Sequence, residues 1–285
     1  MTCNPQESAE MSKPTHLKPS ALGTKEYWDN LYESELSNHA DDPSNTGTVW
    51  FDDSDAETKL IEFLSSSSAD LHLSQETTSF LDLGTGNGSL LFALRDSDWK
   101  GRMLGVDYSA QSVQFARRIA ESRSSSSSSS NSDSDSDSRE EPITFLEHDI
   151  LSSPSALLTG AQSNGWDVVL DKGTFDAISL SSTIDPATGL RINESYKSRI
   201  TPLVRENGIF LVTSCNWTEE ELRVWFEGEV RVEEEEEEEK KNGSNRGGWK
   251  FVEVGRVAYP SFSFGGVKGQ TISSLCFRKV RISTS

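Results

Sequence analysis

The feature that most constrains the fold is a glycine-rich turn between an apolar run and a helix-forming run. The stretch Ser79-Phe-Leu-Asp-Leu-Gly-Thr-Gly-Asn-Gly88 begins with strand-like residues and ends with three glycines at alternate positions. Helix-forming residues follow at once over 90–94. Glycine allows positive φ and lets a ligand touch bare backbone, while the first N–H groups of the helix point into the turn. The sequence therefore predicts a strand–turn–helix unit that binds a nucleotide-like small molecule.

Strand and helix patterns alternate along the rest of the chain. Further strands are expected at 102–106, 143–146, 166–170 and 209–213. Residues 249–257 and 271–280 are also strand-rich, and they are expected to pair as an antiparallel hairpin. This order predicts an α/β fold with a mostly parallel sheet and one reversed edge strand. Such a sheet binds its ligand outside the carboxyl ends of its strands.

One domain is expected, over residues 23–285, after a disordered tail over 1–22. Two low-complexity inserts interrupt it, at 122–141 and 230–248. The first consists mainly of serine and acidic residues, and the second contains seven consecutive glutamates. Neither insert is expected to contribute to the core.

The net charge is −19, which argues against nucleic acid as a partner because phosphate binding needs a basic face. A basic protein partner fits this charge, and simple solubility explains it equally well. The three cysteines are far apart and form no metal or disulfide spacing, which indicates reducing conditions. No signal peptide and no membrane span is expected, so we predict a soluble cytosolic or nuclear monomer without a bound metal.

Asp82 and Asp107 extend the prediction for the glycine turn. A nicotinamide site would place a third glycine three positions after Gly86, where this chain has Ser89. Gly-x-Gly-x-Gly after an acidic strand residue is instead typical of S-adenosylmethionine methyltransferases. Asp82 is then expected to receive the ammonium group of the ligand, and Asp107, at the end of the next strand, to accept its ribose hydroxyls. A plain tight loop and a helix-capping aspartate are the alternatives.

Three more strand ends carry candidate residues. Asp149 ends the third strand, where it can accept from an adenine amino group or face solvent. Asp171 ends the fourth strand, where a substrate would meet the cofactor, and it is expected to orient an incoming amine. Phe175 can form a channel wall or contact a cationic amine through its ring face. In this region Lys172 and Asp176 can pair with each other or with water.

Other candidates lie at the two ends of the domain. Asn216 and Trp217 end the fifth strand and are expected on the substrate side. The loop at 260–266 contains Phe262 and Phe264, and it is either substrate-facing or a plain hairpin connection. Near the N-terminus, a helix with Tyr27, Trp28 and Tyr32 either covers the cofactor or simply packs on the domain.

Several of these blocks together resemble the eukaryotic elongation factor 1-alpha lysine methyltransferases, a family of seven-β-strand class I methyltransferases. The matching stretches are 27–32, Trp50-Phe51, 81–88, 105–109, Leu170-Asp-Lys-Gly-Thr-Phe-Asp-Ala-Ile-Ser-Leu180, Thr213-Ser-Cys-Asn-Trp217 and Phe262-Ser-Phe-Gly-Gly266. The glycine turn is shared by many methyltransferases, whereas the last three stretches are much narrower. Asp52-Asp53 departs from the expected Gly-Glu, and the two inserts suggest a fungal-type member.

The resemblance implies a seven-stranded Rossmann-like sheet and S-adenosylmethionine-dependent methylation of a lysine of elongation factor 1-alpha in the cytoplasm. It implies Asp171 and Phe175 as catalytic residues. Substrate contacts would come from Asn216, Trp217, Phe262 and Phe264. Cofactor contacts would come from Trp28, Asp82, Gly84, Thr85, Gly86, Asn87, Gly88, Asp107, Tyr108, Asp149, Ile150 and Asp171. A small-molecule N-methyltransferase, acting on a polyamine or metabolite, and a non-catalytic S-adenosylmethionine-binding protein remain the alternatives.

Overall fold

An eight-stranded mixed sheet forms the centre of the protein. The computed structural model describes residues 13–127, 141–152, 154–186, 188–230, 248–264 and 267–282. The strands of the main sheet are β1 (Phe80–Leu83), β2 (Met103–Asp107), β3 (Thr144–Glu147), β4 (Trp166–Lys172), β5 (Val204–Ser214), β6 (Gly228–Val230), β7 (Trp249–Val257) and β10 (Ser273–Arg281). Their order is β3-β2-β1-β4-β5-β10-β7-β6. A separate hairpin pairs β8 (Ser261–Phe264) with β9 (Val267–Gln270).

The strand directions confirm the expected α/β class. Strands β1 to β5 are parallel, and β10 is antiparallel to both β5 and β7. The reversed strand is C-terminal, as expected, but it lies between β5 and β7 rather than at the rim. On this side of the sheet the edge strand is β6, which has three residues and pairs with β7. The main sheet thus has eight strands, one more than the resemblance predicted.

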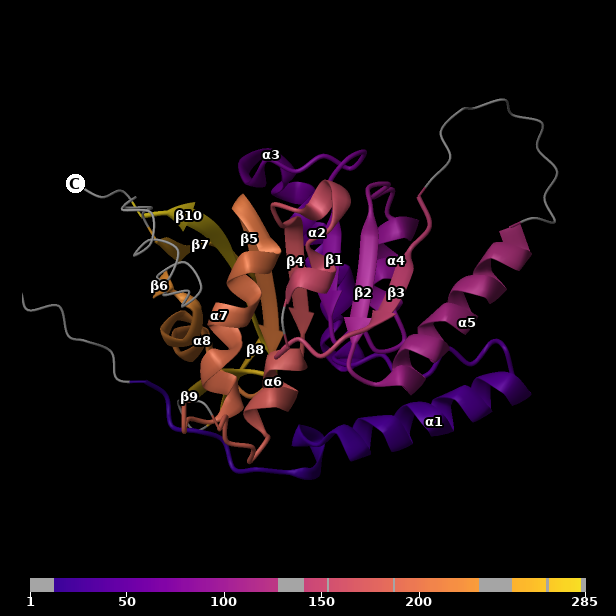
Figure 1. The fold of residues 1–285 in the computed structure, drawn as a ribbon, viewed down its shortest axis with the longest axis horizontal. Helices are drawn as coiled ribbons and strands as arrows, with labels where there is room; N and C mark the ends of the chain where they lie inside the picture. The colour runs from indigo at the N-terminus through magenta and orange to yellow at the C-terminus, as the bar shows by residue number, and fades with distance from the viewer. Residues whose placement is uncertain are drawn as a thin grey trace, which may run out of the picture.

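Helices cover both faces of the sheet (Figure 1). They are α1 (Lys25–Asp41), α2 (Ala56–Ser66), α3 (Ser68–Leu71), α4 (Ser89–Asp96), α5 (Ala110–Ser127), α6 (Thr174–Ser179), α7 (Tyr196–Ile200) and α8 (Glu219–Phe226). Short 3-10 turns occur at Ala21–Gly23, Asp52–Ser54, Pro154–Leu157, Gly160–Gln162, Ile192–Ser195 and Thr201–Leu203.

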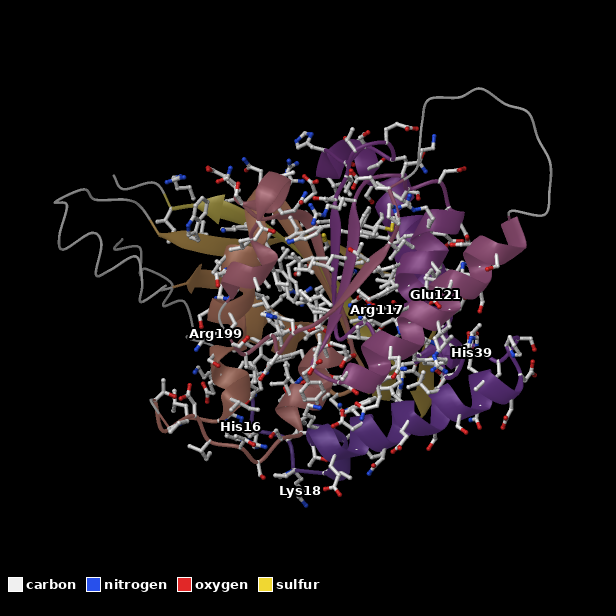
Figure 2. The ribbon with its side chains drawn as sticks, turned by 45° about the vertical axis from the view of Figure 1, so that its right-hand side comes forward. His16, Lys18, His39, Arg117, Glu121 and Arg199 are labelled. Carbon is white, nitrogen blue, oxygen red and sulfur yellow. The ribbon has the colours of Figure 1, made fainter. Side chains whose placement is uncertain are left out.

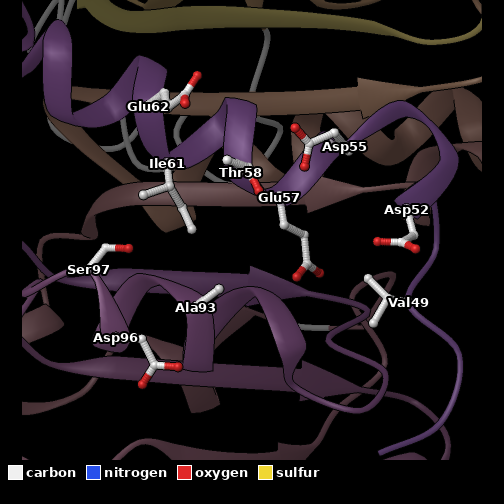
Figure 3. Close-up of a pocket in the computed structure, with 11 residues that line it drawn as sticks. Val49, Asp52, Asp55, Glu57, Thr58, Ile61, Glu62, Ala93, Asp96 and Ser97 are labelled. Atoms are coloured by element: carbon white, nitrogen blue, oxygen red, sulfur yellow. The ribbon is translucent and has the colours of Figure 1, made fainter.

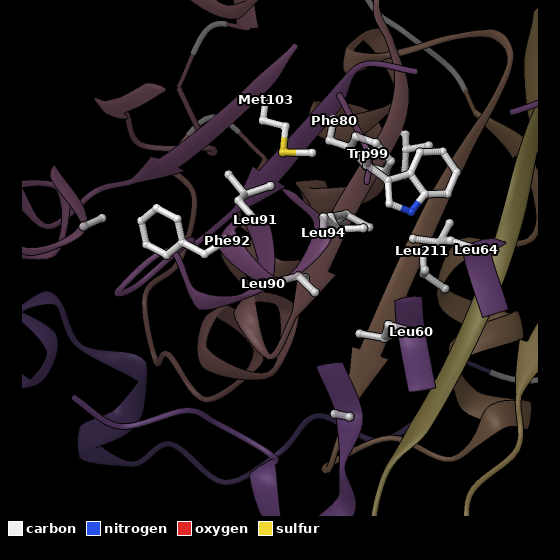
Figure 4. Close-up of a cluster of buried hydrophobic side chains, with 14 of the residues drawn as sticks. Leu60, Leu64, Phe80, Leu90, Leu91, Phe92, Leu94, Trp99, Met103 and Leu211 are labelled. Carbon is white, nitrogen blue, oxygen red and sulfur yellow. The ribbon is translucent and has the colours of Figure 1, made fainter. Parts of the chain in front are cut away.

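Successive side chains of the central strands point to opposite faces of the sheet, and this divides the core into two clusters. Phe80, Val168 and Leu170 belong to the cluster under α2, α4 and α5, whereas Leu81 and Val169 belong to the cluster under α7 and α8. Figure 4 shows the first cluster, including Leu60 and Leu64 of α2, Leu90, Leu91 and Leu94 of α4, and the fully buried Trp99. Burial on both faces explains why the central strands read as nearly continuous apolar runs.

The N-terminal part of the chain packs on the domain. Residues 13–22 were expected in a disordered tail, but Ser20 N–H donates to the Leu180 carbonyl (3.1 Å) and Arg191 donates to the Leu17 carbonyl (2.8 Å). Helix α1 then crosses the edge at which the parallel strands end (Figure 1). It lies along α5, where His39 contacts the ring of Phe115 (Figure 2). Residues 13–41 therefore cover the edge where the sequence predicts the ligand.

The expected inserts are only partly described. Helix α5 continues to Ser127, so residues 122–127, assigned to the first insert, are helical. Val230, the first residue assigned to the second insert, ends β6. Residues 128–140 and 231–247, which hold most of both inserts, lie outside the described ranges. Within those ranges, none of the helices is long and apolar enough to cross a membrane.

Candidate functional site

The glycine turn has the geometry that its sequence predicts. Gly84, Gly86 and Gly88 all have positive φ, at 63°, 58° and 79°. A Cβ at Gly84 would lie 2.1 Å from Thr174 Oγ1, and one at Gly86 would lie 2.6 Å from the Tyr32 hydroxyl oxygen. Only glycine fits this backbone and these close approaches. Helix α4 begins at the next residue, so its free N–H groups point toward the turn.

Asp107 is fixed beside this turn at the end of β2. Its carboxylate accepts from Gly86 N–H (3.1 Å) and from Ser109 N–H (2.9 Å). The Ser112 hydroxyl donates to the Gly86 carbonyl (2.8 Å), so both backbone polar groups of Gly86 are held. Burial raises the pKa of the Asp107 carboxyl, and these donors oppose that effect. The carboxylate has further lone pairs, so it can also accept from a pair of hydroxyl groups.

Asp82 is a buried carboxyl in the strand that leads into the turn. Its side chain lies on the same face of the sheet as that of Phe80, because residues two apart in a strand share a face. Burial raises its pKa to about 7, and the charge of Lys172 acts in the opposite direction. A carboxyl in this environment would be stabilised as an anion by a cationic ligand group.

The end of β3 lies next to Asp107, since His148 N–H donates to the Asp107 carbonyl (2.8 Å). Asp149 is exposed and accepts from Leu151 N–H (2.9 Å), and Ile150 is half-buried. Tyr108 follows Asp107, and the Lys25 ammonium lies 5.6 Å from its ring centroid. The structure therefore brings these predicted cofactor residues to one edge, beneath the start of α1.

Asp171 is held by its own helix and by a tyrosine. Its carboxylate accepts from Thr174 N–H (2.8 Å), from Phe175 N–H (3.1 Å) and from the Tyr196 hydroxyl (2.5 Å). Burial raises its pKa to about 7, and the Tyr196 hydrogen bond is the largest opposing effect. With 1% exposure, this carboxyl organises the junction of β4 and α6 and does not project into open space.

Phe175 also differs from its expected place. Its side chain is 1% exposed, and its ring centroid lies 5.3 Å from that of Tyr196 and 4.8 Å from that of Phe226. Trp217 belongs to the same cluster, at 6.2 Å from Phe175. The ring therefore supports the site from within the core rather than forming a channel wall.

Lys172 and Asp176 do not pair with each other. Asp176 accepts from Cys215 N–H (2.8 Å) and from the Ser214 hydroxyl. Lys172 lies 3.4 Å from Glu57 Oε1 on α2. Lys172 follows the fully buried Asp171 in β4, so its side chain leaves the sheet on the opposite face, toward α2.

The substrate-side candidates are less closely grouped. Asn216 is exposed, while Trp217 is buried and its indole N–H donates to the Ser179 hydroxyl (3.3 Å). Phe262 and Phe264 belong to β8, but their side chains lie outside the described part of the structure.

The N-terminal segment closes over the glycine turn. The Asn87 amide donates to the carbonyls of Thr46 (2.9 Å) and Thr48 (3.3 Å). Thr85 is buried beside it in the turn. The Trp28 ring lies 5.3 Å from Trp50 and 6.3 Å from Tyr32, which approaches Gly86. Trp28 thus reaches the cofactor edge as part of a cover made by α1 and the loop that follows it.

Tyr196, Thr174 and Glu57 contribute to the site but were not among the predicted site residues. Thr174 Oγ1 donates to the Leu83 carbonyl (2.6 Å) and so joins α6 to the glycine turn. Nothing in the sequence indicated a role for Tyr196. Its distance of 25 residues from Asp171 gave no local signal for their hydrogen bond.

A pocket of about 470 Å³ opens between α2 and α4 (Figure 3). None of the residues expected to hold the cofactor lines it. Its lining includes Asp52, Asp55, Glu57, Glu62 and Asp96. No group of three or more His, Cys, Asp or Glu side chains suited to a metal ion occurs in the described ranges.

Comparison with known proteins gives consistent results. Residues 74–255 match the family model of a methyltransferase domain. The chain is 38% identical to protein-lysine N-methyltransferase EFM4 of Saccharomyces cerevisiae, over 94% of this chain and 99% of that protein. It is 36% identical to efm4 of Schizosaccharomyces pombe (92% and 95% covered) and 31% identical to EEF1A lysine methyltransferase 2 of Homo sapiens (92% and 88% covered).

Proposed function

The chain belongs to the methyltransferase-domain family and, within it, to the protein-lysine N-methyltransferases that include EFM4 and EEF1A lysine methyltransferase 2, and we propose that it methylates a lysine of translation elongation factor 1-alpha. One observation carries the choice of substrate. The similarity to EFM4 covers 94% of this chain and 99% of that relative, so it includes the substrate side as well as the cofactor turn.

The residues at the strand ends fit S-adenosylmethionine as the cofactor. The close approaches of Thr174 to Gly84 and of Tyr32 to Gly86 exclude a Cβ on both residues, so only glycine keeps this turn in the shape that presents the free N–H groups of α4 to a ligand. Asp107 would accept the ribose hydroxyls, and buried Asp82 would pair with the ammonium group. Tyr108, Asp149 and Ile150 would surround the adenine, beside Trp28 of the cover. The cofactor supplies a methyl group on a sulfonium that carries its own leaving group.

The main catalytic task of the protein is then positioning. Aligning two reactants contributes about 7–11 kcal/mol to lowering a barrier of this kind. Asp171 would act by fixing the start of α6 and the end of β4, with Tyr196 and Phe175 supporting it from the core. Asn216 is exposed at the end of β5, where it would contact the substrate, together with the loop that holds Phe262 and Phe264.

A protein substrate of this kind also suits the charge of the chain. With a net charge of −19, the protein attracts a basic surface around a target lysine. We place the reaction in the cytoplasm, where elongation factor 1-alpha works, with the protein acting as a monomer and without nucleic acid.

The test is transfer of labelled methyl groups from S-adenosylmethionine to purified elongation factor 1-alpha, followed by mass spectrometry of its lysines. We expect label on lysine with the unaltered protein and with Asp70→Ala, which removes an exposed carboxylate on α3. We expect none with Asp107→Ala. Label on no protein would refute the proposal. Label appearing on small molecules in a protein-free extract would instead support the small-molecule alternative.

A further inference from the structure

A partly buried ion pair lies behind the glycine turn. Lys172, the last residue of β4, and Glu57, in the first turn of α2, are 3.4 Å apart, with side chains 12% and 15% exposed. Placing two charges in so little solvent is unfavourable unless further hydrogen bonds compensate. The mutual attraction of the two charges therefore does not by itself explain why this pair is buried.

Both partners make such further contacts, each to a different segment. Lys172 Nζ donates to the Trp50 carbonyl (3.1 Å) and lies 6.0 Å from the ring centroid of Phe51. Glu57 Oε1 accepts from the hydroxyl of Ser89 (2.5 Å), the first residue of α4. Glu57 points from α2 into the space beside α4 (Figure 3). The pair thus joins the end of β4, the Trp50–Phe51 segment and the helix that follows the glycine turn.

The Trp50–Phe51 segment needs to be held. Phe51 has φ of 66°, a left-handed conformation that is unfavourable for a residue with a bulky side chain. Its ring lies 3.2 Å from where a Cβ of Gly173 would be, so it packs directly on the turn after β4. Trp50 in turn contacts Trp28 of α1. Loss of the contacts from Lys172 would release the cover at this point.

We propose that Lys172 and Glu57 are positioning residues: their ion pair clamps the Trp50–Phe51 segment onto the end of β4 and keeps the cover closed over the cofactor edge. This inference rests on the proposed methyltransferase function. The two residues touch neither the reacting amine nor the methyl group, and they act through the segments that they hold.

The same pair also acts on the charge of Asp82. The charged and titratable groups around Asp82 come from four elements: Lys172 of β4, Glu57 of α2, Asp107 of β2 and Tyr32 of α1, with Tyr196 on the far side. Burial raises the pKa of Asp82 to about 7; Lys172 lowers it, and Glu57 and Asp107 raise it. Removing Lys172 should therefore raise this pKa further, whereas removing the charge of Glu57 should lower it.

These opposite signs separate the proposal from a merely structural role. The variants are Lys172→Met, Glu57→Gln and the conservative Lys172→Arg. Lys59→Met is the matched control, because Lys59 of the same helix pairs with the exposed N-cap residue Asp55. Turnover is measured on elongation factor 1-alpha at saturating S-adenosylmethionine. Binding of S-adenosylmethionine is measured by calorimetry across neutral pH, on protein whose folding is checked by circular dichroism.

We expect Lys172→Met and Glu57→Gln each to lower kcat about tenfold or more, because small displacements in a site cost rate steeply. Lys172→Arg should retain most of the activity, and Lys59→Met all of it. The pH midpoint of cofactor binding should move up in Lys172→Met and down in Glu57→Gln, by about half a unit or more.

Unchanged turnover in both variants, or midpoints that move in the same direction, would overturn the proposal. If Lys172→Met does not fold, Glu57→Gln still provides both readouts, lower kcat and a lower pH midpoint, against the charge-conserving Lys172→Arg as reference. Failure of the proposed function would look different. The unaltered protein would then leave elongation factor 1-alpha unlabelled, while the pH midpoints of cofactor binding would still separate the variants.

Discussion

At the scale of single residues, the hydrogen bond from Tyr196 to Asp171 should set a pH-dependent part of the stability. Because burial raises the folded pKa of Asp171 to about 7, its contribution to stability is present at low pH and lost as pH rises through that value. Tyr196→Phe removes a donor that opposes the shift. We expect it to lower the free energy of unfolding by about 1.5–3 kcal/mol near pH 8.5, where the carboxyl is ionised, and by about 1 kcal/mol near pH 5.5.

Urea unfolding at the two pH values measures this difference. Tyr259→Phe is the matched control, because its hydroxyl is hydrogen-bonded to the neutral Ser274 hydroxyl (2.8 Å) in the same domain. Its loss of stability should be the same at both pH values. An equal loss at both pH values for Tyr196→Phe would mean that Asp171 does not change its charge between them.

Residue patterns predicted local parts of the site better than distant ones. The glycine turn was predictable because strand, turn and helix signals lie within sixteen adjacent positions, and positive φ at alternate glycines follows from their chemistry. The bond of Asp171 to Tyr196 and the pairing of Lys172 with Glu57 were not predictable. Both depend on how distant helices pack on the sheet, and spacing along one strand carries no information about that packing.

At the scale of elements, Arg191 should hold the N-terminal stretch against the domain. Its guanidinium donates to the carbonyls of Leu17 (2.8 Å) and Ser181. Arg191→Ala leaves these carbonyls without their charged donor, which costs about 1–3 kcal/mol for buried groups. We expect amide hydrogen exchange over 13–23 to become about tenfold faster or more, while exchange in β1 and β4 stays unchanged.

The control for this element is Arg256→Ala, which removes an exposed arginine and breaks its pair with Glu219, a pair that includes no residue of 13–23. It should leave their exchange unchanged. Equal exchange in Arg191→Ala and the unaltered protein would show that other contacts hold the stretch, such as the His16–Glu194 pair (3.0 Å). Composition alone had predicted disorder here, because a polar, proline-containing stretch shows no periodicity even when its backbone groups find partners.

At the scale of the whole molecule, the sequence predicted the α/β architecture but not the strand order at the C-terminal side of the sheet. Alternating strands and helices predict a parallel sheet because crossovers need a helix-length connection. The sequence did not indicate which strand of the C-terminal antiparallel pair lies next to β5, since such a pair can join the sheet through either strand. In the structure β10 lies between β5 and β7. The three residues of β6 are too few to give any periodic signal.

The overall charge should affect how the protein meets its substrate rather than the chemical step. Residues 233–239 are seven glutamates, a large share of the net charge of −19. Replacing all seven by glutamine should lower kcat/KM for elongation factor 1-alpha about threefold to tenfold near 0.05 M salt, with kcat unchanged, because long-range attraction accelerates encounter. Near 0.5 M salt the difference should vanish, since screening shortens the range of the attraction.

Replacement by seven aspartates keeps the charge and should behave like the unaltered protein. A loss that persists at high salt, or that also appears with aspartate, would show that the run acts through specific contacts and not through its charge.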